Sequence, residues 1–320
     1  MASHPVLTTV IVSYNTRALL DPCLGALAKA CEGLGPCDVI LVDNASRDGS
    51  AEHVEQCHPG VRLIRSGGNL GFGRANNLAL PFFDAPYMLL LNTDAFVAPD
   101  SVRVALQFME ANPACGVLGV RLTGRDGEVQ PSCRYFPTPL NIFLARTGLT
   151  RFVPGVRMID GPIWAPADAT ECDWVPGCFY LIRKEVIDRV GLFDPRYFLY
   201  YEEVDHCLAV QRAGWKIMYT PATSVVHIGG ESAKADSKLT SGGRQIDVIS
   251  MESAMLYFRK NFGLPKLLVH IGLELLGDAI LLLKALLKRR GAQSRTEPYR
   301  RMGATLRLAR ATRMGLAATR

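Results

Sequence analysis

Two acidic segments of this 320-residue chain have the residue types and spacing to do chemistry. The first is an apolar run that ends at Asp94, and the second places Glu202, Glu203 and Asp205 within four residues. A carboxylate at the end of a buried strand suits a hard divalent cation that bridges diphosphate oxygens. Three clustered acids exceed what a helix N-terminus needs for its dipole, so one of them fits a general base. Together the segments indicate one acid for a metal and another for a proton.

Each of these roles has a plainer alternative. Asp94 is also suited to cap a turn, and the acids at 202–205 are suited to decorate a helix N-terminus. Tyrosines and phenylalanines surround the second segment, and the next helix carries apolar residues. Partial burial and like charges would raise the pKa of at least one carboxylate there, which favours the general base. His227 ends a later strand-like segment, and a lone histidine is most often structural.

The elements that must position these acids alternate between strands and helices. Apolar and β-branched runs predict strands at 6–13, 38–43, 61–65, 87–92 and 115–120, with helices between them. This order predicts an α/β fold, a mostly parallel sheet with helices on both faces. In such sheets ligands bind at the carboxyl ends of the strands. The polar residues at these ends are Tyr14, Asn15, Asp43, Asn44, Asn69 and Asp94.

Asp43 and the glycine-rich segment 71–77 each have more than one possible interpretation. Asp43 is placed to accept a hydrogen bond from a ribose hydroxyl or a base imide, although an Asx turn is equally compatible. The segment 71–77 resembles a dinucleotide loop, but Asn76 stands where the third glycine is required and the segment follows the third strand. We therefore reject a dinucleotide fold. A glycine-rich helix entry still suits an anion, and Arg74 is placed to neutralise phosphate.

The second half of the chain is less regular. Residues 121–173 are rich in proline and glycine and indicate an insertion over the site, with a hairpin at 124–127. Regular structure is predicted to return with a strand at 173–183 that bears Trp174 and Gly177. Helices are expected at 184–190 and 202–213, followed by strands near 216–219 and 223–228.

The C-terminal region is helical and basic. Leucines at helical spacing fill 264–290, but Glu274, Asp278 and Lys284 interrupt them, so a membrane-spanning helix is not expected. From 284 to 320 there are eleven lysines and arginines against one acid. Two alternatives stay open: a helix or helical pair packed on the body, or an interfacial helix against an anionic membrane. No aromatic interleaving or reader motif accompanies the charge, so nucleic acid is not an expected partner.

The composition narrows the class of protein. With 48% hydrophobic and 21% charged residues the chain is globular. Nine cysteines without a CxxC pair fit free thiols in a reducing compartment. The first residues lead directly into a strand without a basic and apolar leader, so we expect no signal peptide. These features predict a cytoplasmic protein, peripheral at the inner face of the cytoplasmic membrane.

Six segments in order resemble the family 2 glycosyltransferases of GT-A fold, and among them the bacterial rhamnosyltransferase-like branch. The resemblance covers roughly residues 6 to 230. The segments that carry it are TVIVSYN at 9–15, VDNASRDGS at 42–50, GNLGFGRANN at 68–77, LNTD at 91–94, VPGCF at 175–179 and GLFDPRYFLYYEEVD at 191–205.

The resemblance implies an inverting transfer of a sugar, with rhamnose as the candidate, from a nucleotide diphosphate donor to a saccharide or lipid-linked saccharide acceptor in cell-surface polysaccharide biosynthesis. Glu203 is implied as the base, with Glu202 and Asp205 as supports or acceptor contacts. Asp94 and His227 are implied ligands of Mg²⁺ or Mn²⁺. The implied donor-binding residues are Ser13, Tyr14, Asn15, Asp43, Asn69, Arg74, Asn76, Asn92, Thr93 and Asp94, and the acceptor-binding residues are Trp174 and Gly177.

The chain departs from the family pattern at two positions. Asn92 stands where the DXD motif has its first acid, which leaves metal dependence open. The base position has two glutamates, Glu202 and Glu203, where Glu-Asp is common, which leaves the choice between them open.

The resemblance divides the chain into a catalytic domain at 1–230 and a helical, basic extension at 231–320 that associates with the membrane. Within the domain, 1–120 would form the nucleotide-sugar half and 121–230 the acceptor half. A sugar-nucleotide pyrophosphorylase is one alternative, but the loop at 14–17 lacks the glycines it needs. A catalytically silent GT-A-like binding protein is the other.

Overall fold

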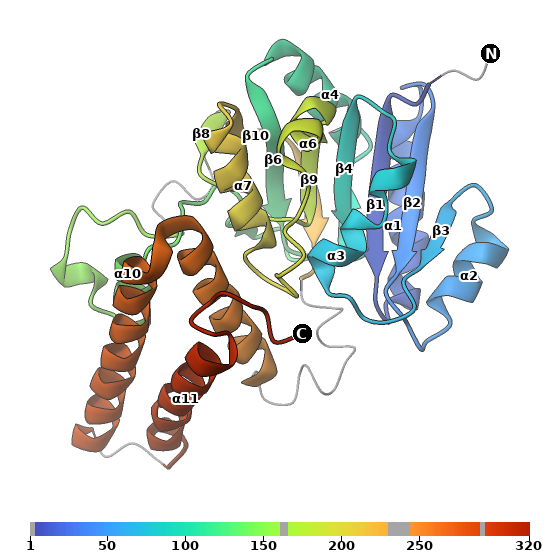
Figure 1. Ribbon diagram of the computed structural model, residues 1–320. Helices are drawn as coiled ribbons and strands as arrows, with labels where there is room; N and C mark the ends of the chain where they lie inside the picture. Colours follow the sequence, from blue (N-terminus) through green and yellow to red (C-terminus); the bar gives the residue numbers. More distant parts are fainter. Residues whose placement is uncertain (1–3, 161–165, 230–243, 289–291) are drawn as a thin grey trace.

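The computed structural model describes residues 4–160, 166–229, 244–288 and 292–320 (Figure 1). Its strands are β1 (Leu7–Ser13), β2 (Cys37–Asp43), β3 (Arg62–Arg65), β4 (Tyr87–Asn92), β5 (Ala95–Val97), β6 (Cys115–Thr123), β7 (Val129–Gln130), β8 (Thr170–Cys172), β9 (Phe179–Arg183) and β10 (Lys216–His227). Its helices are α1 (Arg17–Cys31), α2 (Ser50–Cys57), α3 (Phe72–Asn77), α4 (Ser101–Ala111), α5 (Pro139–Thr147), α6 (Lys184–Val190), α7 (Glu202–Arg212), α10 (Arg244–Leu287) and α11 (Ala292–Ala311), with short 3₁₀ turns η1 (Leu80–Phe82) and η2 (Thr150–Phe152).

All ten strands belong to one sheet, in the order β3-β2-β1-β4-β9-β6-β10-β5, with β7 beside β6 and β8 beside β10. The predicted α/β fold is confirmed. Strands β3, β2, β1 and β4 run parallel, as do β6 and β10. Strands β5, β7, β8 and β9 are antiparallel to their neighbours. The parallel half brings the carboxyl ends of four strands to one edge, and Ser13 is in register with Asp43 there.

Two predicted strand boundaries were wrong. The strand expected from residue 173 begins only at Phe179, because Trp174 forms an isolated bridge with Arg134 and the chain turns before β9. The two strands expected after α7 are one strand, β10, with an irregularity between Thr220 and Ser224. The hairpin at 124–127 is confirmed, since β6 and β7 pair antiparallel across it.

Helices cover both faces of the sheet, as predicted. Alternate residues of each strand enter opposite cores, so Val10 and Leu90 lie in one and Ile11 and Leu91 in the other. The second core is closed by α1 and α4. The first is closed by α3, α6, α7 and the first part of α10. Of these elements, α7 carries the acids Glu202, Glu203 and Asp205.

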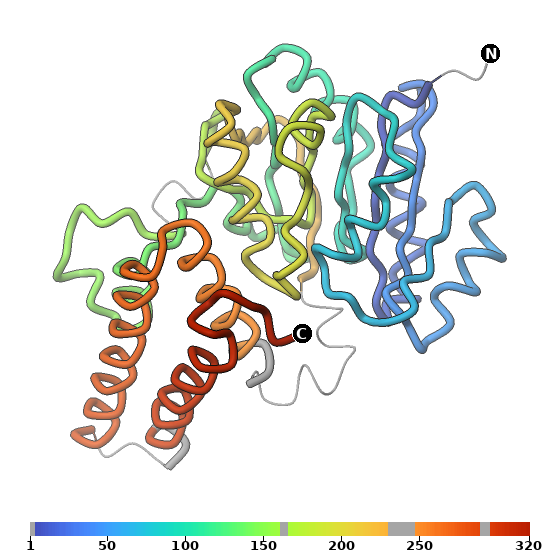
Figure 2. Tube along the Cα trace, viewed as in Figure 1, coloured from blue at the N-terminus to red at the C-terminus, as the bar shows by residue number. Residues whose placement is uncertain are grey.

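The C-terminal helices have a packed part and a projecting part. Helix α10 kinks at Gly263 (φ 79°), and before the kink Tyr257 and Phe258 are fully buried in the first core. After the kink, α10 lies beside α11 and both extend away from the sheet (Figure 2). No helix among the described residues is long and apolar enough to cross a membrane. The expected boundary at 230/231 falls outside the described residues.

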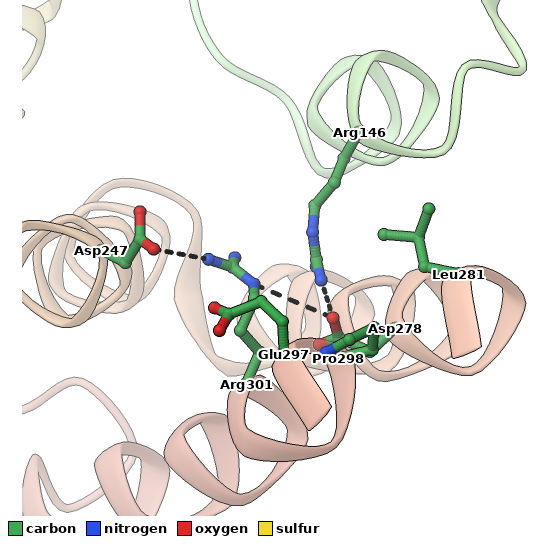
Figure 3. Close-up of a pocket in the computed structure, with 7 residues that line it drawn as sticks. All are labelled: Arg146, Asp247, Asp278, Leu281, Glu297, Pro298 and Arg301. Carbon is green, nitrogen blue, oxygen red and sulfur yellow. Dashed lines mark hydrogen bonds and ion pairs between the residues drawn. The ribbon is translucent and has the colours of Figure 1, made fainter. Parts of the chain in front are cut away.

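Buried ion pairs join this helical pair to the body. Arg146 of α5 reaches Glu274 (Nη1–Oε2 2.7 Å) and the fully buried Asp278 of α10. Arg301 of α11 also contacts Glu274, at 3.3 Å, and Asp247 at 3.7 Å. A pocket of about 310 Å³ lies between the three helices (Figure 3), and it is lined by Arg146, Asp247, Asp278, Leu281, Glu297, Pro298 and Arg301. The charged residues that interrupt the leucine pattern therefore hold α10 against α5 and α11.

Candidate active site

Asp43, at the carboxyl end of β2, is buried with one oxygen unused. Its Oδ2 accepts a hydrogen bond from the Ser46 backbone N–H at 3.2 Å, whereas Oδ1 is buried without a hydrogen-bond partner among the described residues. A buried carboxylate oxygen is costly to leave unpaired, so Oδ1 is suited to accept a hydrogen bond from a ligand. A base imide or a ribose hydroxyl provides such a donor.

The turn after β2 is tied to the turn after β1. Asn15, in the left-handed region (φ 53°), donates its backbone N–H to Ser46 Oγ at 3.0 Å and accepts from the Arg47 N–H at 2.7 Å. Ser13 Oγ shares a 3.0 Å hydrogen bond with Thr16. These contacts use the side chains of Asn15 and Ser13 to shape the loop. Tyr14, which lies between Ser13 and Asn15 in the sequence, is half-buried.

Asp94 and His227 form the candidate metal site. Asp94 is 5% exposed, and its Oδ1 lies 3.6 Å from His227 Nε2 at the end of β10. The other ring nitrogen, Nδ1, lies 3.0 Å from Gln130 Oε1, and Gln130 Nε2 donates to the His227 carbonyl at 2.8 Å. A proton on Nδ1 directs the Nε2 lone pair toward Asp94, which is the arrangement of a metal-ligating histidine. Burial lowers the pKa of His227, which keeps the ring neutral.

Asn92 and Thr93 lie directly before Asp94. The Asn92 backbone N–H donates to the Cys178 carbonyl at 3.1 Å, and its side chain is half-buried at the end of β4. Thr93 is 1% exposed. The donor set here therefore has one carboxylate and one imidazole, and these oxygen and nitrogen ligands fit Mn²⁺ or Mg²⁺ when diphosphate oxygens complete the shell.

Backbone packing explains the glycine-rich segment before α3. A Cβ on Gly71 (φ 79°) would lie 1.9 Å from the Phe198 carbonyl oxygen, which accepts the Phe72 N–H at 2.9 Å. Gly73 lies against Phe193, where a Cβ would come 3.1 Å from the Phe193 Cβ. At Gly71 the left-handed conformation and the close Phe198 carbonyl permit only glycine, so the segment fixes α3 against the chain that leads into α7.

The other candidate residues of this segment make local contacts. Asn69 Oδ1 accepts from Asn44 Nδ2 at 3.1 Å and from the Gly71 N–H at 3.0 Å. Asn76 is buried and donates to the Phe72 carbonyl. Arg74 donates Nε to the Leu70 carbonyl at 2.8 Å, and its guanidinium lies 6.0 Å from the Phe198 ring centroid.

Glu202 and Glu203 begin α7 after two residues in left-handed conformation, Tyr200 (φ 69°) and Tyr201 (φ 68°). Such strain in non-glycine residues collects at functional sites. Glu202 is 3% exposed, Glu203 is partly exposed, and each has a buried Oε2 without a hydrogen-bond partner in the part of the chain that the structure describes. Burial raises the pKa of Glu203, and burial followed by repulsion from Glu203 raises that of Glu202 well above its usual range.

The buried thiol of Cys178 connects the two acidic segments. Burial raises its pKa to about 12, and the charges of Asp94 and Glu203 add to the effect. The charges of both carboxylates, the predicted metal ligand and the predicted base, therefore reach the same buried side chain.

Asp205 has a different environment, although it lies only two residues from Glu203. Lys260 Nζ of α10 lies 2.5 Å from its Oδ2, and Asn261 Nδ2 donates to Oδ1 at 2.6 Å. The Tyr197 hydroxyl donates to the same Oδ1 at 3.2 Å. Lys260 also reaches Asp194 Oδ2 at 2.7 Å. Cationic and neutral donors thus occupy both carboxylate oxygens of Asp205, so this residue has a structural role and holds α7 in place.

Trp174 and Gly177 lie in the turn before β9. Trp174 is 6% exposed, donates Nε1–H to the Tyr135 carbonyl at 2.8 Å and is covered by the Arg134 guanidinium, 4.9 Å from the ring centroid. Gly177 lies against the ring of Phe72. The charge of Arg134 also reaches Glu203 and partly offsets the effect of burial on its pKa.

Sequence reasoning missed Gln130, Arg134 and Lys260. Each lies outside the six motif segments. Lys260 contacts Asp205 across 55 positions of the sequence, and Gln130 contacts His227 across 97 positions. No local pattern identifies them.

The fold matches solved glycosyltransferases. A mannosyltransferase from Pyrobaculum calidifontis, in complex with GDP-Man and Mn²⁺, aligns with a TM-score of 0.55 at 16% identity, over 98% of this chain and 88% of that one. S. aureus TarS 1-349 aligns with a TM-score of 0.52 at 14% identity, over 97% and 91%. These likenesses show that the chain has the GT-A fold of glycosyltransferases.

Sequence comparisons give the family. Residues 8–161 match the model of glycosyl transferase family 2. The N-acetylglucosaminyl-diphospho-decaprenol L-rhamnosyltransferase of Mycobacterium tuberculosis is 30% identical over 256 residues, which covers 72% of this chain and 78% of that protein. Rhamnosyltransferase WbbL of Escherichia coli is 31% identical, over 55% of this chain and 67% of that protein. The chain belongs to glycosyltransferase family 2, and the prediction of a glycosyltransferase of cell-surface polysaccharide biosynthesis is confirmed.

Proposed function

We propose that the enzyme moves rhamnose, with inversion, from a nucleotide diphosphate donor to a sugar that is linked through diphosphate to a lipid. The observation that carries this proposal is the facing pair Asp94 and His227, oriented by Gln130. The buried Oε2 of Glu203 has no hydrogen-bond partner among the described residues, and the charges of Asp94 and Glu203 both reach the Cys178 thiol. The rhamnosyltransferases of M. tuberculosis and E. coli support the choice of sugar, and the printed name of the first supports the lipid-linked acceptor.

The donor would lie along the carboxyl ends of β1, β2 and β4. Asp43 Oδ1 would accept a hydrogen bond from the nucleoside, and the loops at 13–15 and 92–94 would border it. Asp94 and His227 would hold Mg²⁺ or Mn²⁺, and such an ion neutralises charge that develops on a departing diphosphate.

Glu203 would serve as the general base. In one displacement, the acceptor oxygen bonds to the anomeric carbon, the bond from that carbon to the diphosphate oxygen breaks, and the acceptor proton passes to Glu203. Glu203 suits this role better than Glu202, because it is the more exposed of the two and Arg134 favours its charged form. Glu202 would remain protonated beside it and hold the geometry. Asp205 would support α7 through Lys260.

The C-terminal helical pair would contact an anionic membrane at its inner, cytoplasmic face. The second part of α10 exposes Leu268, Leu276, Leu283 and Leu287, at 50 to 74% of their surfaces, along one stripe. Helix α11 exposes Tyr299 at 72%, and its solvent-exposed cations are Arg295, Arg300, Arg307 and Arg310. An apolar stripe beside arginines is the pattern of an interfacial helix. This contact would bring the active site to a lipid-linked acceptor.

Donor turnover tests the transferase proposal. We would measure release of nucleoside diphosphate from UDP-, dTDP- and GDP-sugars with Mg²⁺, Mn²⁺ or chelator, with and without an N-acetylglucosaminyl-diphosphate lipid acceptor. We expect one donor, a dTDP-rhamnose, to react only with the acceptor and a metal, and we expect Asp94→Ala to abolish the reaction. Reaction with chelator at the full rate would overturn the metal assignment.

Vesicle flotation tests the membrane proposal. We expect the full-length protein to bind vesicles that contain phosphatidylglycerol, and the double variant Leu283→Glu, Leu287→Glu to lose most of this binding while it keeps donor affinity. Phe82→Glu is the matched control, because Phe82 is 45% exposed but lies in η1 on the sheet domain. Equal binding by all three proteins would contradict the proposal.

A further inference from the structure

A cluster of metal-ligating side chains lies outside the site described above. Asp21 of α1 faces His53 of α2 and His58 just after it. One oxygen, Asp21 Oδ1, lies 2.8 Å from His53 Nε2 and 2.7 Å from His58 Nε2. In the part of the chain that the structure describes, this is the one set of three such residues whose ligand atoms all lie within 4.8 Å of one another.

We propose that Asp21, His53 and His58 bind a divalent transition-metal ion of the Zn²⁺ class. Two imidazole nitrogens and one carboxylate oxygen form a donor set that selects Zn²⁺ and its neighbours over Mg²⁺ and Mn²⁺. This site, the α1–α2 metal clasp, differs in position and in chemistry from the Asp94–His227 pair.

The ligand atoms must separate slightly to accept the ion. Zinc bonds of about 2.1 Å at tetrahedral angles separate neighbouring ligand atoms by about 3.4 Å, so Asp21 Oδ1 must withdraw by roughly 0.6 Å from His53 Nε2 and by roughly 0.7 Å from His58 Nε2. The Asp21 side chain is 61% exposed and has the freedom to move. The imidazoles are 16% and 23% exposed, which holds them in place and leaves the remaining coordination position to water.

A neighbouring thiol supplies the proton arrangement that a ligating histidine needs. Cys57 Sγ, one helical turn after His53, lies 3.7 Å from its Nδ1. Without metal, each Nε2 carries the hydrogen that it donates to Asp21. With metal, Nε2 offers its lone pair and the hydrogen resides on Nδ1, where Cys57 Sγ accepts it. A partner on the second ring nitrogen orients metal-bound histidines in this way.

The clasp lies next to a loop of the donor site. Arg17, one helical turn before Asp21, donates its backbone N–H to Asp48 Oδ2 at 2.8 Å, and Asp48 Oδ1 accepts from Ser50 Oγ at 2.5 Å. These contacts join α1 and α2 at the turn that follows Asp43. A bound ion links the two helices a second time and stabilises the folded protein by mass action.

Zinc binding to the full-length protein tests the inference. Isothermal titration with Zn²⁺ alone, in chelator-treated protein kept in excess Mg²⁺, should give one site. The double variant His53→Gln, His58→Gln should weaken binding at least about 10-fold and lose the zinc-dependent rise in Tm. The matched control is His4→Gln, whose side chain is 87% exposed and contacts only Asp84 among the described ion pairs; it should bind as the wild type does.

A second control separates this site from the active site. Asp94→Asn should retain the zinc site, because the clasp shares no residue with Asp94. Loss of zinc binding in Asp94→Asn with retention in the double histidine variant would place the ion at the active site and overturn the inference. Absence of zinc binding in the wild type would reduce the clasp to an exposed ion pair. Neither outcome depends on transferase activity, so the proposed function is tested separately.

Discussion

Glu203 and Asp205 lie two residues apart on α7, and their surroundings differ in kind. Glu203 has a buried oxygen without a hydrogen-bond partner among the described residues, and burial raises its pKa. Asp205, at 3% exposed, is more buried than Glu203 but is held by Lys260, Asn261 and Tyr197. The same contrast separates Asp43, with its unused Oδ1, from Glu274, which is paired with arginines.

The difference teaches how this fold divides its buried acids between chemistry and architecture. A buried carboxylate without a cation costs stability and remains available to take a proton or to accept a ligand hydrogen bond. A buried carboxylate with a cation is committed to the structure. Helix α10 supplies that cation to Asp205 through Lys260, so in the proposed mechanism this helix separates the structural acid of the cluster from the reactive one.

The largest expected effect is the loss of catalysis when Glu203 is replaced. Glu203→Gln removes the base, and we expect the transfer rate to fall about 10³-fold, or about 4 kcal/mol in activation free energy. The raised pKa means that ionised Glu203 destabilises the fold as pH rises through its folded pKa. Glu203→Gln should therefore unfold at an equal or higher Tm at neutral pH.

The isosteric variant Glu202→Gln is the control, because it removes a neighbouring acid from the same helix turn. It should lose much less activity if Glu202 stays protonated. A loss as large as that of Glu203→Gln would show that the two glutamates act as one coupled unit.

The second largest effect is expected on the stability of the protein when Lys260, which pairs with Asp205 and Asp194, is replaced. Lys260→Met leaves the buried Asp205 without its cation and leaves Asp194 with Arg196 alone, so we expect the free energy of unfolding to fall by about 3 kcal/mol in urea titration. Although burial opposes it, hydrogen bonds from Arg196 and Lys260 hold the pKa of Asp194 well below its usual range. Asp194 thus contributes stability above its unfolded pKa that is lost as pH falls.

The deficit of Lys260→Met should accordingly shrink below about pH 4, where carboxylates protonate in the unfolded chain. Adding Asp205→Asn to Lys260→Met should restore part of the stability. Full stability of Lys260→Met alone would remove the distinction between the two kinds of acid.

A smaller effect is expected at Asp43. Asp43→Asn keeps the shape but replaces one acceptor oxygen with an amide that donates, so it should weaken donor affinity about 10-fold, or about 1.4 kcal/mol. Because Asp43 Oδ1 has no hydrogen-bond partner within the described ranges, Tm should change little. Titration of the nucleoside diphosphate against the protein measures the affinity. A fall in Tm with unchanged affinity would make Asp43 an architectural acid.

The sequence predicted which acids lie at the candidate site but not which of them is paired with a cation. Strand ends and motif order located Asp43, Asp94 and Glu203, because a parallel sheet gathers the carboxyl ends of its strands. It could not separate Asp205 from Glu203, since the distinction depends on Lys260, 55 positions away. The start of β9 was missed for a similar reason: the bridge between Trp174 and Arg134 is a tertiary contact.

The smallest predicted effect concerns Arg134, whose charge reaches Glu203 without pairing with it as Lys260 pairs with Asp205. Burial raises the pKa of Glu203, and Arg134 partly opposes that rise. The base form is lost as pH falls through the raised pKa, so Arg134→Gln should move the acid limb of the pH–rate profile to higher pH and leave the rate at alkaline pH near that of the wild type. Arg157→Gln is the matched control, because Arg157 covers Tyr135 at 4.1 Å as Arg134 covers Trp174. If Arg134→Gln instead lowers the rate equally at every pH, Arg134 binds substrate and does not tune the base.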